Sequence, residues 1–451
     1  MTPRPASALP IAPALLFALA LTGCEPNAAV VAERDEARTE RDALQARLDE
    51  LDGGDATGAA DFAPVLTALR DAGASVTETD GVVTAVAMPA TSATTGAHLL
   101  PLLLMPELKI LTLGGTAFDD DDMKIVGQLD SLERLDISGA TSVRNEGFAH
   151  LDGLTNLKVL RMKTVAVSDL TPIEGMQDLR ELDLRFSNAD DGSMDSVAKL
   201  PNLATLKLER SAVTDEGLAK LSADQPIKAL DLDKGFYEPL PIIVERFPDL
   251  RSLELDRSDL YLPEHFAPLA KLTELRSLSL QEAYAGDAEL EPALKELTNL
   301  ESLNLRQTSA SDKLMPTVGK LTNLKTLNLA EVAGVTEDGL MELKGLTKLE
   351  NLDLWDTGAN DAVMQEVVAG FENLRALSLQ KTAVGDEGIK ALAGLENLQR
   401  LDLTETEITD ESVATLKTLP NLTSLTLKNA AVSAEGIAEL EEAKPDLQIT
   451  Q

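Results

Sequence analysis

The chain of 451 residues is poor in the side chains that carry most enzyme chemistry. It contains one cysteine, three histidines and one tryptophan, and aromatic residues make up only 3% of it. The histidines, His98, His150 and His265, lack metal-ligand spacing, and the sequence has neither a GxxxxGK[ST] phosphate loop nor a GxSxG nucleophile elbow. These absences indicate a protein that is not an enzyme and that needs no cofactor.

Basic residues are also scarce, since 40 of them stand against 76 acidic residues and give a net charge of −36. Such a field repels nucleic acid and anionic lipid head groups. The charge is typical of a solvated surface that keeps a long protein soluble, and the alternative is attraction to cations or to a basic partner. The acidic run at residues 119–122 is either a calcium site or a solvated loop.

With so few aromatic residues, aliphatic side chains must build the core, and leucine recurs in a fixed pattern. In residues 398–422, leucine occupies relative positions 1, 4 and 6 and a hydroxyl residue occupies position 9. The first leucine recurs at steps of 22 to 25 residues, at Leu108, Leu132, Leu157, Leu179, Leu203, Ile227, Leu250, Leu275, Leu300, Leu324, Leu349, Leu374, Leu398 and Leu422. This period predicts a solenoid of stacked repeats in place of separate globular domains.

Each repeat carries signals for a strand, a turn and a helix. The alternation at positions 4 to 6 suits a short strand with its leucines facing inward. A hydroxyl group at position 9 can bond turn backbone, as expected at Thr116, Ser187, Ser211, Ser258, Thr308, Thr357, Thr382 and Thr406. Segments such as VTDEGL at residues 213–218 then predict the start of a helix.

This pattern resembles the leucine-rich repeat family over about residues 80–449, with about fifteen repeats. The wording LxLxxTxVTDEGL is closest to the cysteine-containing and ribonuclease-inhibitor-like subclasses, although threonine or serine stands where asparagine usually occurs. The resemblance implies an α/β horseshoe with a parallel sheet on its concave face and helices on its convex face. It implies binding of another macromolecule in general, and no particular ligand.

The first 23 residues predict a lipoprotein signal peptide. Arg4 precedes an apolar run too short to span a bilayer, which ends in Leu-Thr-Gly-Cys. This tetrapeptide resembles the lipobox of bacterial lipoproteins, which implies a lipid-modified, palmitate-bearing Cys24 as the new N-terminus. An ordinary signal peptide with a chance cysteine is the alternative. We therefore expect a membrane-anchored protein of the cell envelope that faces the periplasm or the exterior.

Four further segments follow the signal peptide. Residues 24–52 are rich in good helix formers and predict a helical stalk, and residues 53–60 predict a flexible linker. Residues 61–107 predict a cap helix and a divergent first repeat, with Val83, Val86 and Met88 at positions 1, 4 and 6. Residues 108–451 form the repeat array, and a closing strand begins near residue 445.

Positions 3, 5 and 7 should point into the concave face. Position 5 carries an alternating ladder of charge that begins at Asp136 and Arg161. One interpretation is mutual neutralisation of neighbouring strands. The other is a protein-binding surface with a basic patch at Arg161, Lys163, Arg185 and Lys207 and an acidic patch at Asp231, Asp233, Glu254 and Asp256.

Aromatic residues supply two further candidates. The irregular repeats that start at Ile227, Leu250 and Leu275 hold all three tyrosines, which either pack an altered convex segment or form a recognition patch that includes Tyr237. Trp355, at position 7, is expected to be exposed on the concave face.

The leading hypothesis is therefore a lipid-anchored bacterial protein that binds an unknown protein on its concave face. The alternative is an envelope scaffold that self-associates through its stalk. A glycan ligand is disfavoured because few aromatic side chains are present to stack on sugars.

Overall fold

The structure is a computed structural model that describes residues 63–258 and 260–451. The predicted signal peptide, Cys24, stalk and linker lie outside the described residues. In the described part, no helix has the length and apolar character needed to cross a membrane. The chain divides into two compact units, and the boundary in the sequence falls between Pro226 and Ile227.

The first unit begins with a cap that the sequence predicted in part. Helix α3 (Ala63–Asp71) packs on strand β1 (Ser75–Thr79), which pairs with β2 (Val82–Met88) in an antiparallel ladder. Strand β2 is the divergent first repeat, because Val86 lies beside Leu111 in a parallel ladder and Val83, Val86 and Met88 are buried. A cap helix and a first-repeat strand therefore lie within residues 63–107, and the antiparallel strand β1 was not predicted.

Parallel strands follow β2 in sequence order, one to each repeat. They are β3 (Ile110–Leu113), β4 (Arg134–Asp136), β5 (Val159–Arg161), β6 (Glu181–Asp183) and β7 (Thr205–Lys207). The helices of this unit are short. They are α4 (Asp120–Val126), α5 (Asn145–Phe148), α6 (Met194–Val197) and α7 (Asp215–Leu218), with 3-10 helices η1 (Gly96–His98), η2 (Leu100–Leu104), η3 (Ala149–Gly153) and η4 (Thr171–Gly175).

The second unit continues the same construction. Its parallel strands are β8 (Ala229–Leu232), β9 (Ser252–Leu255), β10 (Ser277–Ser279), β11 (Ser302–Asn304), β12 (Thr326–Asn328), β13 (Asn351–Asp353), β14 (Ala376–Ser378), β15 (Arg400–Asp402), β16 (Ser424–Thr426) and β17 (Gln448–Thr450). Strand β17 pairs with β16 and confirms the predicted closing strand.

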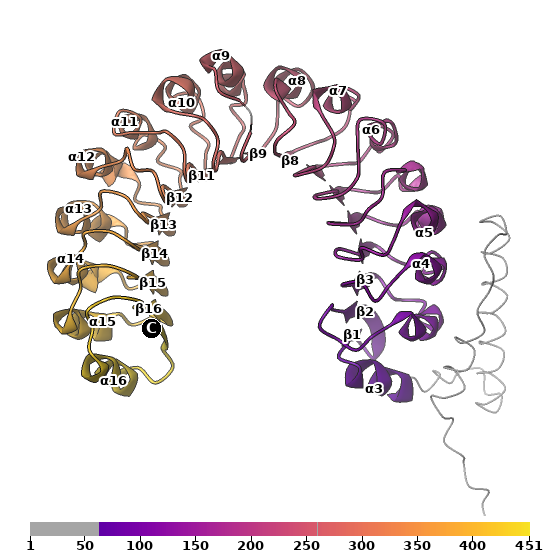
Figure 1. The fold of residues 1–451 in the computed structure, drawn as a ribbon, viewed down its shortest axis with the longest axis horizontal. Coiled ribbons are helices and arrows are strands. Elements are labelled where there is room, and N and C mark those ends of the chain that lie inside the picture. Colours follow the sequence, from indigo (N-terminus) through magenta and orange to yellow (C-terminus); the bar gives the residue numbers. More distant parts are fainter. Residues whose placement is uncertain (1–62, 259) are drawn as a thin grey trace, which may run out of the picture. The chain divides into compact units, whose positions relative to one another are not determined.

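The helices of the second unit follow the strands one by one. They are α8 (Pro239–Arg246), α9 (Pro263–Phe266), α10 (Asp287–Leu294), α11 (Met315–Val318), α12 (Glu337–Leu340), α13 (Asp361–Glu366), α14 (Asp386–Lys390), α15 (Val413–Thr418) and α16 (Ala434–Ala443). The 3-10 helices are η5 (Ala267–Lys271), η6 (Met341–Gly345), η7 (Val368–Gly370), η8 (Ala391–Gly394) and η9 (Asp410–Ser412). Within each unit the helices lie along one side of the strands and leave the other side open (Figure 1).

The core is the stack of leucines that the pattern predicts. Leu398, Leu401 and Leu403 are at most 2% exposed, and positions 1, 4 and 6 are buried in the same way from Leu108 to Leu427. Leucines at position 4 stand side by side in the ladder, as Leu377 does with Leu401. Because each repeat buries its apolar face only against its neighbours, the stack as a whole is needed to exclude water.

A left-handed turn follows each strand, and the hydroxyl group at position 9 supports it. The residue at position 8 has a positive φ, for example 57° at Lys381 and 55° at Glu405. The hydroxyl groups of Thr382 and Thr406 donate to the carbonyl oxygens of Leu379 and Leu403 at 2.6 and 2.7 Å. The hydroxyl prediction is confirmed at these turns. This left-handed position was not predicted, because residues other than glycine occupy it in most repeats.

The aspartate and the glycine of motifs such as VTDEGL link one repeat to the next. The Asp191 carboxylate accepts hydrogen bonds from the backbone nitrogens of Thr214 and Gly217, at 2.8 and 3.0 Å, and so caps α7 from the preceding repeat. Asp120, Asp312 and Asp361 cap their neighbours in the same way. A Cβ atom at Gly217 would lie 2.4 Å from the Asp191 oxygen. The aspartate and the glycine are therefore one device that joins successive repeats.

The acidic run at residues 119–122 also serves as a cap. Asp119 accepts hydrogen bonds from the backbone nitrogens of Asp121 and Asp122, and Asp120 caps the next repeat. Burial, together with the nearby Asp119 and Asp121, raises the pKa of Asp122 to about 6. Within the described ranges, no group of three or more His, Cys, Asp or Glu side chains is placed to hold a metal ion.

Candidate functional site

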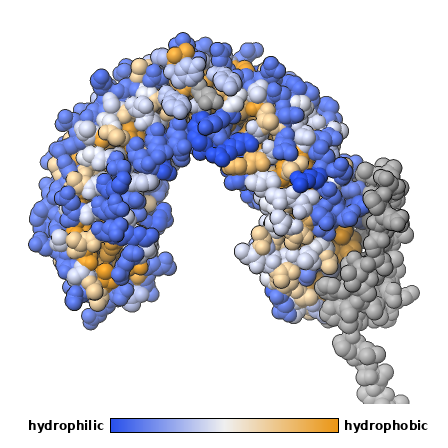
Figure 2. Space-filling model, viewed as in Figure 1, coloured by the Kyte–Doolittle hydropathy of each residue, from blue (hydrophilic) through white to orange (hydrophobic). Residues whose placement is uncertain are grey.

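The candidate site is the open face of the sheet, defined by the side chains at positions 3 and 5 of each strand and by position 7 just beyond. In β5, β7 and β10 to β14 the central leucine is buried, while the residues on either side of it are half-buried and face outward. Hydrophilic residues cover most of the surface seen in Figure 2. At positions 3 and 5 of these strands the side chains point in the predicted direction, whereas position 5 is buried at Asp183 of β6 and at Asp231 of β8.

The basic candidates of the first unit are largely engaged within the fold. Arg161 donates from Nε to Glu181 at 2.8 Å, and Arg185 forms two hydrogen bonds with Asp183, at 2.9 and 2.7 Å. Burial would raise the pKa of Asp183, but its bonds with Arg185 outweigh that effect and lower it. Lys163 lies over the ring of Phe186, 5.0 Å from its centre. Lys207 is half-buried on β7 and forms no salt bridge with another described residue.

The Arg161 pair fits the neutralisation interpretation of the charge ladder, because Glu181 belongs to the adjacent strand β6, whereas Arg185 pairs with Asp183 of its own repeat. Opposite charges on adjacent strands stabilise a sheet by modest amounts, roughly 0.2–1 kcal/mol for a pair. A partner that recruited either guanidinium would first have to break its internal pair.

The acidic candidates belong to the second unit, and two of them need correction. Asp231 is 6% exposed and Asp233 is fully buried, so neither forms part of the surface. The Arg257 guanidinium lies 3.4 Å from Asp233 and compensates its charge inside the protein. Glu254 is half-buried, and Asp256 accepts hydrogen bonds from the Ser279 hydroxyl and the Gln281 backbone. Of the predicted acidic patch, Glu254 and Asp256 remain on the surface.

Trp355 also differs from the prediction, because it is half-buried. The Arg306 guanidinium covers its ring at 5.0 Å and is held there by Glu331, to which Arg306 donates from Nε at 3.0 Å. Arg306 reaches across the small Ala330 of the intervening repeat. The indole Nε1 is buried without a hydrogen-bond partner in the described chain. Trp355 is therefore packed against Arg306 on this face, and its ring is not open to a partner.

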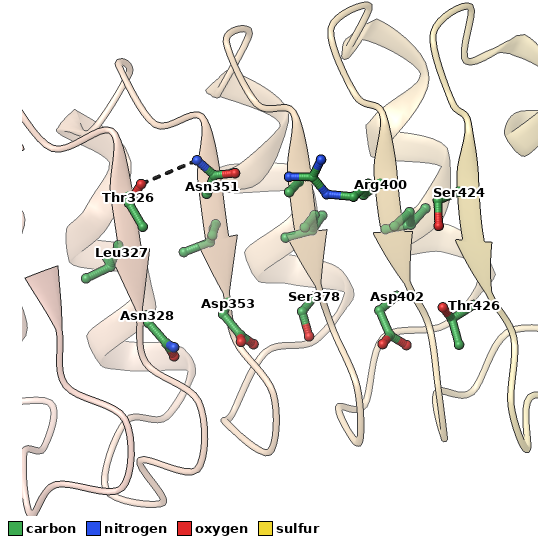
Figure 3. A pocket seen from close by; sticks show the side chains of 14 residues that line it. Thr326, Leu327, Asn328, Asn351, Asp353, Ser378, Arg400, Asp402, Ser424 and Thr426 are labelled. Carbon is green, nitrogen blue, oxygen red and sulfur yellow. Dashed lines mark hydrogen bonds between the residues drawn. The ribbon is translucent and has the colours of Figure 1, made fainter. Parts of the chain in front are cut away.

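A hollow of about 380 Å³ lies on the open face of β12 to β16. Its position-3 side chains are mostly short, and this leaves the space, as Thr326, Asn351, Ala376 and Ser424 show. Position 5 contributes Asn328, Asp353, Ser378, Asp402 and Thr426 (Figure 3). We name this site the polar hollow. The polar hollow was not predicted from the repeat pattern, although the run of short residues at position 3 was a usable signal.

The charges of the polar hollow are arranged in two rows. Arg400 extends from β15 across the neighbouring strand β14 in the upper row of Figure 3, and Asp353 and Asp402 lie in the lower row. The Arg400 guanidinium is exposed, and no hydrogen bond or ion pair joins it to another described residue. Burial, with a contribution from Asp402, raises the pKa of Asp353. The hollow therefore presents an unpaired cation opposite two carboxyl groups.

The tyrosines of the irregular repeats stand outside the hollow and face solvent. Tyr237, Tyr261 and Tyr284 are 60%, 61% and 71% exposed. At these exposures the tyrosines lie outside the core, in which Phe236 is buried instead, and Tyr261 packs edge-on against His265 of α9.

Comparison with known proteins supports the fold. A family model described as a leucine-rich repeat region matches residues 236–393, and a second leucine-rich repeat model matches residues 394–417. The chain is 28% identical over 138 residues to leucine-rich repeat-containing G-protein coupled receptor 5 of Rattus norvegicus. That match covers 31% of this chain and 15% of the receptor.

Two solved structures are similar to the chain. A yeast complex of Rad7 and Elc1 matches with a TM-score of 0.51 at 17% identity, over 93% of this chain and 92% of that chain. An internalin from Listeria monocytogenes matches with a TM-score of 0.48 at 21% identity, over 81% of this chain and 94% of that one. The ladder of one buried leucine strand per repeat extends beyond the matched residues in both directions. The chain is thus an α/β repeat solenoid, and its residues 236–417 match models of leucine-rich repeats.

Proposed function

We propose that the chain is a non-enzymatic protein-binding module that engages its partner through the polar hollow and is held at the cell envelope by a lipid on Cys24. Leucine-rich repeat regions are generally protein-interaction modules. The observation that carries the proposal is the unpaired Arg400 guanidinium on a hollowed part of the open face.

The contrast among the arginines explains why the hollow is favoured over the patch in the first unit. Arg161 and Arg185 are already bonded to carboxylates, whereas Arg400 retains its donors for a ligand. A guanidinium can bind a partner carboxylate in a two-pronged geometry, which gives orientation as well as affinity.

The dimensions of the polar hollow suit an extended segment of a partner. Four steps between strands β12 and β16, at about 4.8 Å each, span roughly 19 Å. An extended chain of about six residues covers the same distance. The amide and hydroxyl groups of Asn328, Asn351 and Ser424 can bond its backbone.

The partner is to be identified by photo-cross-linking in the intact cell. A photoreactive residue in place of Ser378, at the centre of the hollow, should capture it, whereas one at Lys344 on the helical side should not. The Arg400→Glu substitution should then weaken the purified complex about a hundredfold, because it replaces an unpaired donor with a repelling charge. Arg251→Glu is the matched control, because Arg251 is also an exposed cation. Equal affinities of the two variants would reject the polar hollow as the binding site.

The lipid anchor rests on the LTGC tetrapeptide that ends at Cys24 and has its own test. Cells grown with labelled palmitate should label the natural chain, and the Cys24→Ala chain should remain unlabelled and unprocessed. Several acyl chains on one residue anchor a protein stably where a single chain does not. Label retained in the Cys24→Ala chain would place the lipid elsewhere.

A further inference from the structure

The exposed tyrosines form a second surface, away from the polar hollow. Among the described residues, six large hydrophobic side chains are exposed. Four of them belong to the three consecutive irregular repeats that start at Ile227, Leu250 and Leu275. These four are Tyr237, Tyr261, Leu262 and Tyr284. A cluster of large exposed side chains in an otherwise hydrophilic surface is typical of an interaction site.

Each tyrosine is turned outward by the residue that precedes it. Phe236, Leu260 and Ala283 are 1%, 0% and 3% exposed and anchor their loops in the core. The next side chain in each loop therefore points toward solvent. The exposure of the tyrosines is thus built into the backbone of all three repeats.

The three loops follow the C-terminal ends of three neighbouring strands and therefore lie beside one another. Strands β8, β9 and β10 are parallel and in register, with Leu253 beside both Leu230 and Leu278. Each tyrosine follows its strand and comes two or three residues before α8, α9 or α10. More regular repeats place small residues at the position of Tyr284, namely Ser309, Gly358 and Ala383. We name Tyr237, Tyr261, Leu262 and Tyr284 the tyrosine row.

The surroundings of the tyrosine row are acidic. Glu238 follows Tyr237 directly, Glu282 precedes Tyr284 by two residues, and Glu264 lies in the first turn of α9, three residues after Tyr261. All three glutamates are exposed. Lys234 is the exposed cation of the same loops, while Arg257 is occupied with Asp233. The His265 ring packs edge-on against Tyr261, with centres 5.4 Å apart.

We propose that the tyrosine row docks a basic segment of a partner protein, with lysine or arginine side chains laid over the tyrosine rings and paired with the flanking glutamates. A cation over an aromatic face gains energy from the ring quadrupole, and the gain is larger when water is excluded. Carboxylates at the rim strengthen the attraction and speed association. The strong negative charge of the chain, −36, favours the same kind of partner.

The test uses the full chain and random dodecapeptides displayed on phage. Peptides are selected on the natural protein after depletion on the variant Tyr237→Ser/Tyr261→Ser/Tyr284→Ser. Recovered peptides should be enriched in lysine and arginine. A synthetic copy should bind the natural chain at least about tenfold more tightly than the triple variant, at about 0.5 M salt, where general charge attraction is screened.

A matched control removes charge without touching the row. Glu441→Gln/Glu442→Gln on α16 neutralises two exposed glutamates and should leave the peptide affinity unchanged. The tyrosines are largely exposed, so the thermal melt of the triple variant should match that of the natural chain. Peptides without basic residues, or equal binding by the triple variant, would overturn the proposal. Tyrosine-dependent self-association, or tyrosine-dependent binding of a chito-oligosaccharide probe, would overturn it in favour of a second copy or a glycan. Loss of binding in Arg400→Glu tests the polar hollow separately.

Discussion

The Gly319→Ala variant is expected to lose about 3 kcal/mol or more of stability and to separate two neighbouring repeats locally. A Cβ atom at Gly319 would lie 2.2 Å from the backbone oxygen of Glu342 in the next repeat. The obstacle is backbone and not a flexible side chain, so the repeats must move apart. Because each repeat is stabilised only by its neighbours, such a gap interrupts the leucine stack on both sides.

Gly394→Ala is the matched control for this variant. Gly394 ends η8 in a comparable position, and a Cβ atom there would meet nothing within 4 Å. The control should melt with the natural chain, since alanine is at least as good a helix former as glycine. Thermal melts followed by circular dichroism measure both variants, and hydrogen exchange locates the opening. Equal melting of the two variants would show that the contact at Gly319 is not as close as the structure has it.

The Asp191→Ala variant should lose about 2–3 kcal/mol of stability. The substitution removes hydrogen bonds to the backbone nitrogens of Thr214 and Gly217 and to the Thr214 hydroxyl, which lies 2.8 Å from the other carboxylate oxygen. It leaves a buried nitrogen at Gly217 without an acceptor, and unpaired buried donors are costly.

Two further variants distinguish the loss of this helix cap from a general effect of removing a negative charge. Asp191→Asn keeps one oxygen as an acceptor and should lose less than half as much stability as Asp191→Ala. Asp224→Ala removes an exposed aspartate of the same unit and should change the melting temperature by little. Chemical denaturation of the set measures the differences. If Asp224→Ala were as damaging as Asp191→Ala, the inter-repeat cap would not be the cause.

The repeat pattern by itself determined the fold. Leucines at positions 1, 4 and 6 face inward because a strand alternates its side chains and the period returns each leucine to the same place in the stack. The first repeat at Val83 and the closing strand after Leu447 followed from the same spacing, and the ladders of β2 with β3 and of β16 with β17 confirm them. Only local chain geometry is needed for these conclusions.

The tertiary structure decided which polar side chains remain available. Arg161 is occupied by Glu181 and Arg306 by Glu331, partners 20 and 25 residues away that the repeat period brings alongside. Arg400 has no such partner because its neighbours at position 3 are short, and Asp233 is buried because Arg257 compensates it. Sequence spacing gives the direction of a side chain, but whether its charge is free depends on contacts between repeats, since those contacts set its pairing and its exposure to water.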